Sequence, residues 1–326
     1  MSQEPPARPV HPPSAAPARI GPIDGVLVID KPAGPTSHDV VARVRRICRP
    51  AKVGHTGTLD PTATGVLPLV LGRATRLARF LSATEKTYEA TIRLGRATST
   101  FDVEGEPIGP AWGGLGEADG RLRVGDRAAV EEALATLAGT YQQEPPPYSA
   151  KKIEGVRAYE LARAGRPVQP SAVTVTVRRL ALVAIDGDLV LVEVTATAGF
   201  YVRVLADQLG RRLGVGGHLH ALRRTRSGAF DLSGAVPLAG LERDPEAARS
   251  AIVPLDGLLL ERPAAVLTAA GAERVRHGQE VGPADMVTEP EAVAGPVRLL
   301  DEGGRLVAMS EPADRPRFLH PVVVLG

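Results

Sequence analysis

Residues 54–76 read GHTGTLDPTATGVLPLVLGRATR and place one acid, Asp60, between a loop rich in glycine and threonine and an apolar run. Because Asp60 precedes a proline, its backbone is held out of the α region. Gly54, Gly57 and Gly65 allow sharp turns and close approach of another backbone. Asp, Thr, Gly and Pro also make ordinary turns. This string is longer than a turn needs, and it can hold a single carboxylate in a fixed pose.

The composition limits the classes of protein that fit. The 326 residues allow two domains, or one large domain with an appendage, and 44% hydrophobic residues allow a sizeable core. Basic and acidic residues number 39 and 37, a net charge of +2. This balance is not typical of a nucleic-acid-binding protein, so an anionic partner would have to meet a local basic patch.

Cysteine content and hydropathy indicate the compartment. The one cysteine, Cys48, excludes an intramolecular disulfide and a cysteine-rich zinc site. No apolar run is long enough to span a bilayer, and no signal peptide is visible. We therefore expect a soluble cytoplasmic protein. Residues 1–20 are rich in proline and alanine and predict a disordered tail.

Hydrophobic patterns on both sides of the central stretch predict its neighbours. Residues 25–29 (GVLVI) predict a buried strand, and Ser37 can cap a helix from His38 to about Cys48. A short helix follows over residues 74–81. Residues 86–94 alternate and predict a half-buried strand with Tyr88 near its start.

The rest of the chain predicts more helices and strands in alternation. Residues 101–126 are rich in glycine and predict a loop, and an exposed basic insertion is expected at about 142–166, with a short helix over 158–163. Beyond about residue 252, short strand candidates around Val266, 297–300, 306–309 and 322–325 predict a small β-rich domain. Between these parts the patterns predict helices over 127–138 and 200–213, a hairpin of 173–185 with 189–197, and a strand over 221–230.

The central string closely resembles the signature of the TruB family, bacterial tRNA pseudouridine synthases that act at uridine-55 of the T-arm. Other segments resemble family motifs in the family's order, so that the resemblance covers about residues 23–230. The part after it only loosely resembles the PUA-like domain that often follows. The matching segments are GVLVIDKPAGPTSHDVV, KTYEATIRLG, PPPYSAKKIEGVRAYELAR, GFYVRVLADQLG and GGHLHALRRTRSG.

The resemblance implies an α+β pseudouridine-synthase fold, with a central mixed, mainly antiparallel sheet flanked by helices and a small C-terminal PUA-like β domain. It divides the chain into the tail, a catalytic domain over residues 21–250 that contains the RNA-binding insertion, and the C-terminal domain over 251–326.

The resemblance also implies an isomerisation in which the bond from ribose C1′ to uracil N1 breaks and C1′ rejoins at C5. Asp60 matches the catalytic aspartate, and its role as nucleophile or as base stays open. Arg203 matches the arginine that pairs with it, and a neighbouring guanidinium keeps a desolvated carboxylate ionised. Tyr88 matches the tyrosine that stacks on the target base and can move a proton. No cofactor and no metal are implied.

Four further residues match substrate-binding positions of the family. His55 matches a histidine that fills the space left when the target base is flipped out of its loop. Tyr201 and Leu222 match residues that line the pocket, although both could serve only packing. Lys31 matches a lysine near the floor of the site, where the alternative is a solvated lysine at a strand end.

The partner implied is tRNA, bound at its T-arm and elbow region by a protein that we expect to be monomeric, with no membrane and no guide RNA. The insertion argues against a guide-RNA-dependent relative of the dyskerin type. A tRNA folding chaperone without turnover, or a generic RNA-binding module, leaves the acid and its matching residues unexplained. Phosphate contacts would come from basic candidates in the insertion and near residue 224: Lys151, Lys152, Arg157, Arg163, Arg223, Arg224 and Arg226.

Overall fold

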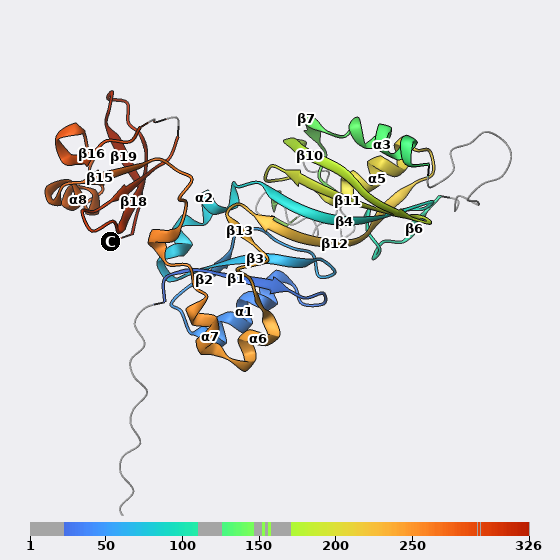
Figure 1. The fold of residues 1–326 in the computed structure, drawn as a ribbon, viewed down its shortest axis with the longest axis horizontal. Helices are drawn as coiled ribbons and strands as arrows, with labels where there is room; N and C mark the ends of the chain where they lie inside the picture. The colour runs from blue at the N-terminus through green and yellow to red at the C-terminus, as the bar shows by residue number, and fades with distance from the viewer. Residues whose placement is uncertain are drawn as a thin grey trace, which may run out of the picture.

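The computed structural model describes residues 23–109, 126–146, 152–153, 156–157, 171–291, 293 and 295–325. These residues form one large mixed sheet with helices around it and a separate C-terminal sheet domain (Figure 1). The α+β fold expected from the sequence is thereby confirmed. The predicted tail, the helix expected over 158–163 and most of the basic insertion lie outside the described residues.

The large sheet has ten strands in the order β14-β1-β3-β12-β4-β11-β10-β7, with β2 beside β3 and β13 beside β12. The pairs β1–β14 and β3–β12 are parallel and the others are antiparallel. The strands are β1 (Gly25–Lys31), β2 (Val53–His55), β3 (Thr64–Leu71), β4 (Lys86–Leu94), β7 (Gly139–Gln143), β10 (Val173–Asp186), β11 (Leu189–Ala196), β12 (Gly217–Ser227), β13 (Phe230–Asp231) and β14 (Val236–Pro237).

Strand β1 is buried on both faces, which explains its continuous apolar sequence. Leu27 and Ile29 belong to the core that contains Val40 of helix α1 (Ser37–Cys48). Val26 and Val28 face the other way and share a second core with residues of the C-terminal domain. A strand covered on both faces reads as a hydrophobic run, whereas one with a solvated face alternates.

Helices α3 (Arg127–Ala135) and α5 (Val202–Arg212) cover the part of the sheet that contains β10 and β11 (Figure 1). Helix α5 packs tightly against the start of β12, because a Cβ at Gly210 would lie 2.1 Å from the backbone nitrogen of Gly217. This close approach holds the last turn of α5 against the sheet, and the predicted site residues Tyr201 and Arg203 lie at the other end of the helix. The remaining helical segments of this part are η1 (Gly72–Leu77), α2 (Ala78–Ser82), α6 (Leu238–Arg243) and α7 (Pro245–Ser250).

The C-terminal domain has a five-stranded sheet in the order β16-β15-β17-β18-β19. The backbone carbonyls of Val324 and Leu325 accept hydrogen bonds of 2.7 Å from Arg76 and Arg73 of η1, so the end of β19 is tied to the large domain. The four strands predicted here are confirmed, whereas helix α8 and strand β16 were not predicted. The elements are η2 (Leu255–Gly257), β15 (Ala264–Leu267), α8 (Ala269–Arg276), η3 (Pro283–Asp285), β16 (Met286–Thr288), β17 (Val297–Leu300), β18 (Leu306–Pro312) and β19 (Leu319–Val324).

Several predicted boundaries are wrong. Thr36, not Ser37, caps α1, in a capping box with Asp39. Helix α3 ends at Ala135 instead of residue 138, because the chain tightens into a turn before β7. Strand β12 begins four residues earlier than the predicted start at residue 221 and ends at Ser227. Within the residues described, no helix has the length and apolar character needed to cross a membrane.

The segment predicted as a loop after residue 101 contains a small turn where it is described. Two short strands, β5 (Ala97–Thr98) and β6 (Pro107–Ile108), pair across it. A second short pair, β8 (Lys152–Ile153) and β9 (Val156–Arg157), lies in the basic insertion.

Candidate active site

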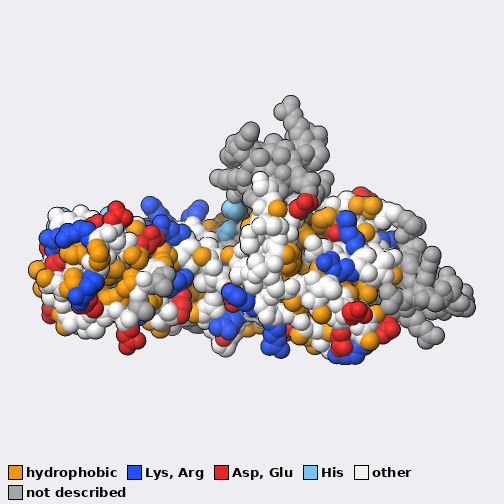
Figure 2. All heavy atoms as spheres, turned by 90° about the horizontal axis from the view of Figure 1, so that it is seen from above, with side chains coloured by type: hydrophobic (Ala, Val, Ile, Leu, Met, Phe, Trp, Pro, Cys, Tyr) orange, Lys and Arg blue, Asp and Glu red, His pale blue; other side chains and the backbone are white. Residues whose placement is uncertain are grey.

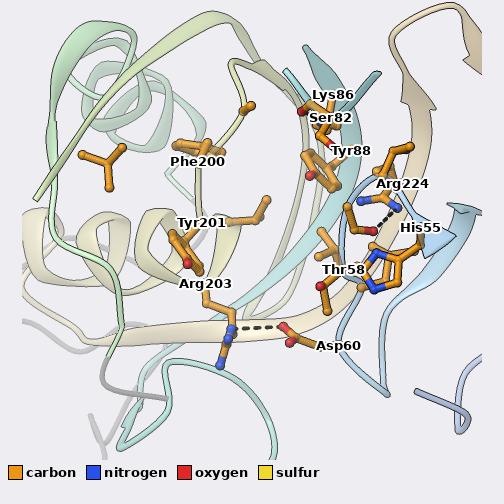
Figure 3. A pocket seen from close by; sticks show the side chains of 18 residues that line it. His55, Thr58, Asp60, Ser82, Lys86, Tyr88, Phe200, Tyr201, Arg203 and Arg224 are labelled. Atoms are coloured by element: carbon orange, nitrogen blue, oxygen red, sulfur yellow. Dashed lines mark hydrogen bonds and ion pairs between the residues drawn. The ribbon is translucent and has the colours of Figure 1, made fainter. Parts of the chain in front are cut away.

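A cavity of about 640 Å³ opens between the loop after β2, strands β4 and β12, and the segment that leads into α5. Figure 3 shows its two ends: Asp60 and Arg203 lie together at one, and Tyr88, Lys86 and Arg224 lie together at the other. Seven of the candidate site residues line this cavity: His55, Asp60, Tyr88, Tyr201, Arg203, Leu222 and Arg224.

Asp60 lies on a loop whose backbone atoms are hydrogen-bonded to two buried side chains, Lys31 and Ser37. Lys31 is fully buried, and its ammonium donates to the carbonyl oxygens of Asp60, Pro61 and Ala63 at 3.2, 3.1 and 2.6 Å. The Ser37 hydroxyl donates to the Leu59 carbonyl at 3.0 Å and accepts from the Leu59 amide at 2.9 Å. The loop is therefore held on both sides of Asp60, whose side chain stays 40% exposed toward the cavity.

Lys31 does not have the position expected of a substrate-binding residue. It does not line the cavity, and it is buried, so the alternative of a solvated strand-end lysine is also wrong. Burial lowers the pKa of Lys31 to about 8, although the nearby charge of Asp60 acts to raise it. The ammonium works on the loop that carries Asp60 rather than on a ligand.

Arg203 joins two acids. Its Nε lies 3.2 Å from Asp60, and its Nη1 lies 3.0 Å from Asp102. The Arg203 and Asp102 side chains are 10% and 9% exposed, so the pair is shielded from solvent while Asp60 faces the cavity. The planar guanidinium suits this bridging, because its donors point in fixed directions toward both carboxylates. The pairing of Asp60 with Arg203 is present in the structure.

Asp102 was missed by sequence reasoning. Its carboxylate accepts hydrogen bonds from the Thr100 hydroxyl at 2.5 Å and the Glu104 amide at 3.1 Å. Phe101 before it has a positive φ of 64°, and its carbonyl is held by the Leu219 amide of β12 at 2.9 Å. A strained backbone anchored to the sheet thus aims Asp102 at Arg203. Phe101 and Asp102 lie in an irregular turn, so no helix or strand periodicity in the sequence could have indicated them.

The far end of the cavity is built on β4 and β12. Tyr88 is 9% exposed and lies in line with the predicted alternation of β4. Arg224 is only 1% exposed, and its Nε and Nη2 donate to the carbonyls of Val66 and Gly57 at 2.7 and 3.1 Å. Lys86 is 7% exposed, and its ammonium donates to the Ser82 and Thr84 carbonyls, both at 2.6 Å.

Tyr201 and His55 stand at the remaining sides. Tyr201 is the N-cap residue of α5, and its amide donates to the buried Gln143 side chain at 2.7 Å. His55 ends β2, and its ring packs edge-to-face on His38 of α1, with the ring centroids 5.4 Å apart. The first turn of α1 therefore contacts both the loop of Asp60, through Ser37, and the histidine beside the cavity.

The comparisons with known proteins agree with this arrangement. The N-terminal domain of the TruB family pseudouridylate synthases matches residues 45–202, and the C-terminal domain of tRNA pseudouridylate synthase B matches residues 203–260. The tRNA pseudouridine synthase B of Solibacter usitatus (strain Ellin6076) is 42% identical over 305 residues, 93% of this chain and 100% of that protein. The chain belongs to the TruB family of pseudouridylate synthases.

Other relatives support the same family. The tRNA pseudouridine synthase B of Thermobifida fusca (strain YX) is 44% identical over 312 residues, 93% of this chain and 99% of its own length. Among solved structures, a crystal structure of a Cbf5-Nop10-Gar1 complex matches with a TM-score of 0.71 and 27% identity, over 93% of this chain and 85% of that one. The pseudouridine-synthase fold implied by the sequence is thereby confirmed.

The basic candidates of this TruB-family chain fall into different surroundings. Figure 2 shows one face of the molecule, where lysine and arginine side chains are scattered among other types. Arg223 is engaged by Asp30 through two hydrogen bonds of 3.1 and 2.9 Å, and Arg226 is exposed. The prediction that Arg224 is a surface phosphate contact is wrong, because its guanidinium is buried against backbone carbonyls at the cavity. Lys151 and Arg163 lie outside the described residues, as do the side chains of Lys152 and Arg157.

Proposed function

We propose that this protein converts uridine-55 in the T-arm of tRNA to pseudouridine. The observation that carries the proposal is Asp60, held by Arg203 at the open side of a cavity of about 640 Å³. Relatives named tRNA pseudouridine synthase B, 42–44% identical over 93% of the chain, support tRNA as the substrate.

The reaction exchanges one bond to C1′ for another, without any net redox change. The C1′–N1 bond breaks with its electron pair going to the base, and the C1′–C5 bond then forms. Asp60 acts at the sugar or base, as nucleophile or as base. Arg203 compensates the charge of the Asp60 carboxylate, and Asp102 holds Arg203 in place from its other side.

The other lining residues receive the nucleotide. Uridine in a folded T-loop must be rotated out before the acid can reach it, which costs a few kcal/mol of lost stacking. Tyr88 offers a ring for the flipped base, Tyr201 and Leu222 line its sides, and His55 occupies the space left in the loop. Phosphate contacts come from Arg226 and from the basic insertion.

We also propose that the chain acts in the cytoplasm, as a monomer and without a guide RNA. The division into a domain over residues 21–250, with the insertion at about 142–166, and a PUA-like domain over 251–326 belongs to this proposal. The second candidate function is a guide-dependent synthase, favoured by the structural likeness to Cbf5 in complexes with partner proteins.

The test is incubation of the purified chain with unmodified tRNA transcripts, followed by mapping of pseudouridine at single-nucleotide resolution. Modification at position 55, lost when the transcript carries cytidine there, is the expected result. A product elsewhere would refute the assignment of the site. Activity only after addition of a second RNA would favour the guide-dependent candidate, and binding without any product would favour the folding chaperone.

A further inference from the structure

The C-terminal end of helix α1 carries a group of cations that the proposed function leaves unused. Arg45 and Arg46 lie in its last turn, Arg49 follows as the C-cap residue, and Lys52 comes three residues later. We call these four residues the α1 cluster, and all four are exposed. Residues three and four apart lie on one face of a helix, so the three arginines project together, away from the side that buries Val44.

The α1 cluster has no acid to balance its charge. Among the residues that the structure describes, none of its four side chains has a hydrogen-bond or ion-pair partner. Asp39, the one acid in the sequence of the helix, lies in the first turn and closes the capping box with Thr36. Helix α1 lies beside α6 and α7 (Figure 1), and Glu246 of α7 is paired with Arg249 of its own helix.

The arrangement of the α1 cluster is unfavourable for the helix itself. Arg45 and Arg49 stand four residues apart, a spacing at which like charges destabilise a helix. Arg49 also has a left-handed backbone with a φ of 50°, which glycine adopts without strain. The helix dipole favours cations within the last turn, whereas Arg49 and Lys52 lie beyond it. Positive charge is therefore kept here at a cost in stability, which points to a role in binding an anion.

Helix α1 connects this cluster to the cavity. At its first turn, the Ser37 hydroxyl is hydrogen-bonded to the loop of Asp60, and His38 packs on His55 beside the cavity. Residues of α1 belong to the same core as Tyr88, so the helix and the cavity lie on one face of the sheet. The helix has 12 residues and spans about 18 Å. An RNA whose uridine enters the cavity therefore has phosphates within reach of the other end of α1.

We propose that the α1 cluster binds phosphates of the tRNA whose uridine occupies the cavity. This inference rests on the proposed function. Exposed cations without acidic partners suit a polyanion, because no ion pair has to be broken and each contact releases counterions from the RNA. Phosphate contacts fix the position of a nucleic acid without reading its bases. The α1 cluster thus adds affinity and orients the RNA, and it takes no part in the exchange of bonds at C1′.

The experiment measures tRNA affinity by filter binding at several salt concentrations between about 50 and 200 mM. The variant combines Arg45→Ala, Arg46→Ala and Arg49→Ala, which are exposed and leave the core intact. It should bind about 10- to 100-fold more weakly at the lower salt concentrations, and the salt slope should fall by about two to three. The kcat at saturating tRNA should be unchanged, because none of the three residues lines the cavity.

The matched control combines Arg127→Ala, Arg178→Ala and Arg317→Ala, since it removes the same charge from exposed arginines that are each paired with a glutamate. Its salt slope should change by less than about one. Changing the three α1 arginines to lysine should keep affinity within about threefold, because a phosphate accepts a point charge.

Equal losses of affinity in the α1 variant and the control would mean that net charge alone acts, and this would overturn the inference. An unchanged affinity and salt slope in the α1 variant would overturn it as well. Binding is measured without turnover, so the two proposals can fail separately. A wild-type chain that makes no pseudouridine would refute the proposed function, whereas the binding series tests the α1 cluster.

Discussion

The two ends of the cavity each hold a buried arginine, and the surroundings of the two are opposite. At the acid end, formed by Asp60, Arg203 and Asp102, the guanidinium lies between two carboxylates. At the cationic end, formed by Tyr88, Lys86 and Arg224, the guanidinium donates to two backbone carbonyls and lies near a second cation. Among the described residues, the same type of side chain therefore meets two carboxylates at one end and none within ion-pair distance at the other.

Arg203 and Arg224 therefore have different roles. Arg203 compensates a charge that is present before the substrate arrives, so its loss leaves an acid misplaced. Arg224 is held by backbone carbonyls instead, so its loss removes a buried link between β12, β3 and the loop of Asp60. Substitutions can therefore test each end of the cavity separately.

The largest effect is expected from Asp60→Asn at the acid end. The amide keeps the shape of the side chain but can neither attack carbon nor accept a proton, so pseudouridine formation should fall by at least about a thousandfold. tRNA affinity, measured by filter binding, should stay within about twofold of the wild type. Residual turnover above a thousandth of the wild-type rate would remove Asp60 from the chemistry.

Asp102→Asn comes next, with an expected loss of about 10- to 100-fold in kcat. Without the second carboxylate, Arg203 loses its buried charge partner and is no longer fixed toward Asp60. Asp207→Asn is the control, because Asp207 is equally buried on α5 and pairs with Arg211 away from the cavity. It should lower the melting temperature but leave kcat unchanged. Equal kcat losses in both variants would indicate a general effect of buried acids.

The acid end also shows how far sequence reasoning extends. Asp60 and Arg203 lie 143 positions apart, yet both stand in motifs that resemble those of a known family, and the structure brings them to 3.2 Å. Asp102 stands in an irregular turn with a left-handed residue before it, and neither periodicity nor motif indicated it. Its position depends on a hydrogen bond to β12, more than 100 residues later.

The cationic end was misjudged for a different reason. Arg223, Arg224 and Arg226 form a basic run that reads as a solvated face. On a strand, alternate residues face opposite sides, and here the residue between Arg223 and Thr225 turns inward against Val66 and Gly57. The irregular register of β12 beside β4 was not visible in the sequence. Regular elements were predicted well because their patterns are local, as for β4.

A smaller effect is expected from the lysine beneath the acid end. The pKa of Lys31 lies near 8, below its ordinary value of 10.5, because of burial. Between these values the unfolded chain binds a proton that the folded chain has released, so the free energy of unfolding rises with pH. Lys31→Met should remove about 2 kcal/mol of this rise between pH 7.5 and 9.5 in urea unfolding. Lys86→Met should behave alike, since its pKa is also about 8.

An unchanged pH dependence in Lys31→Met, together with a reduced one in Lys86→Met, would sharpen the contrast between the two ends. It would mean that the charge of Asp60, which acts to raise the pKa of Lys31, outweighs the effect of burial. The same result for both lysines would mean that burial alone sets their behaviour.

The smallest effect is expected from Arg226→Ala, two residues beyond Arg224 on the same strand. Arg226 is exposed, and its Nε donates to the Gly228 carbonyl at 2.8 Å, which leaves the rest of the guanidinium in solvent. A phosphate contact there should be worth about two- to fivefold in tRNA affinity, and its loss should reduce the salt slope of binding by about one with kcat unchanged. Arg127→Ala on α3 is the control, because that arginine is exposed and paired with Glu131. If Arg226→Ala lowers kcat instead and leaves the salt slope unchanged, Arg226 is not a phosphate contact, and exposure does not distinguish it from the buried Arg224.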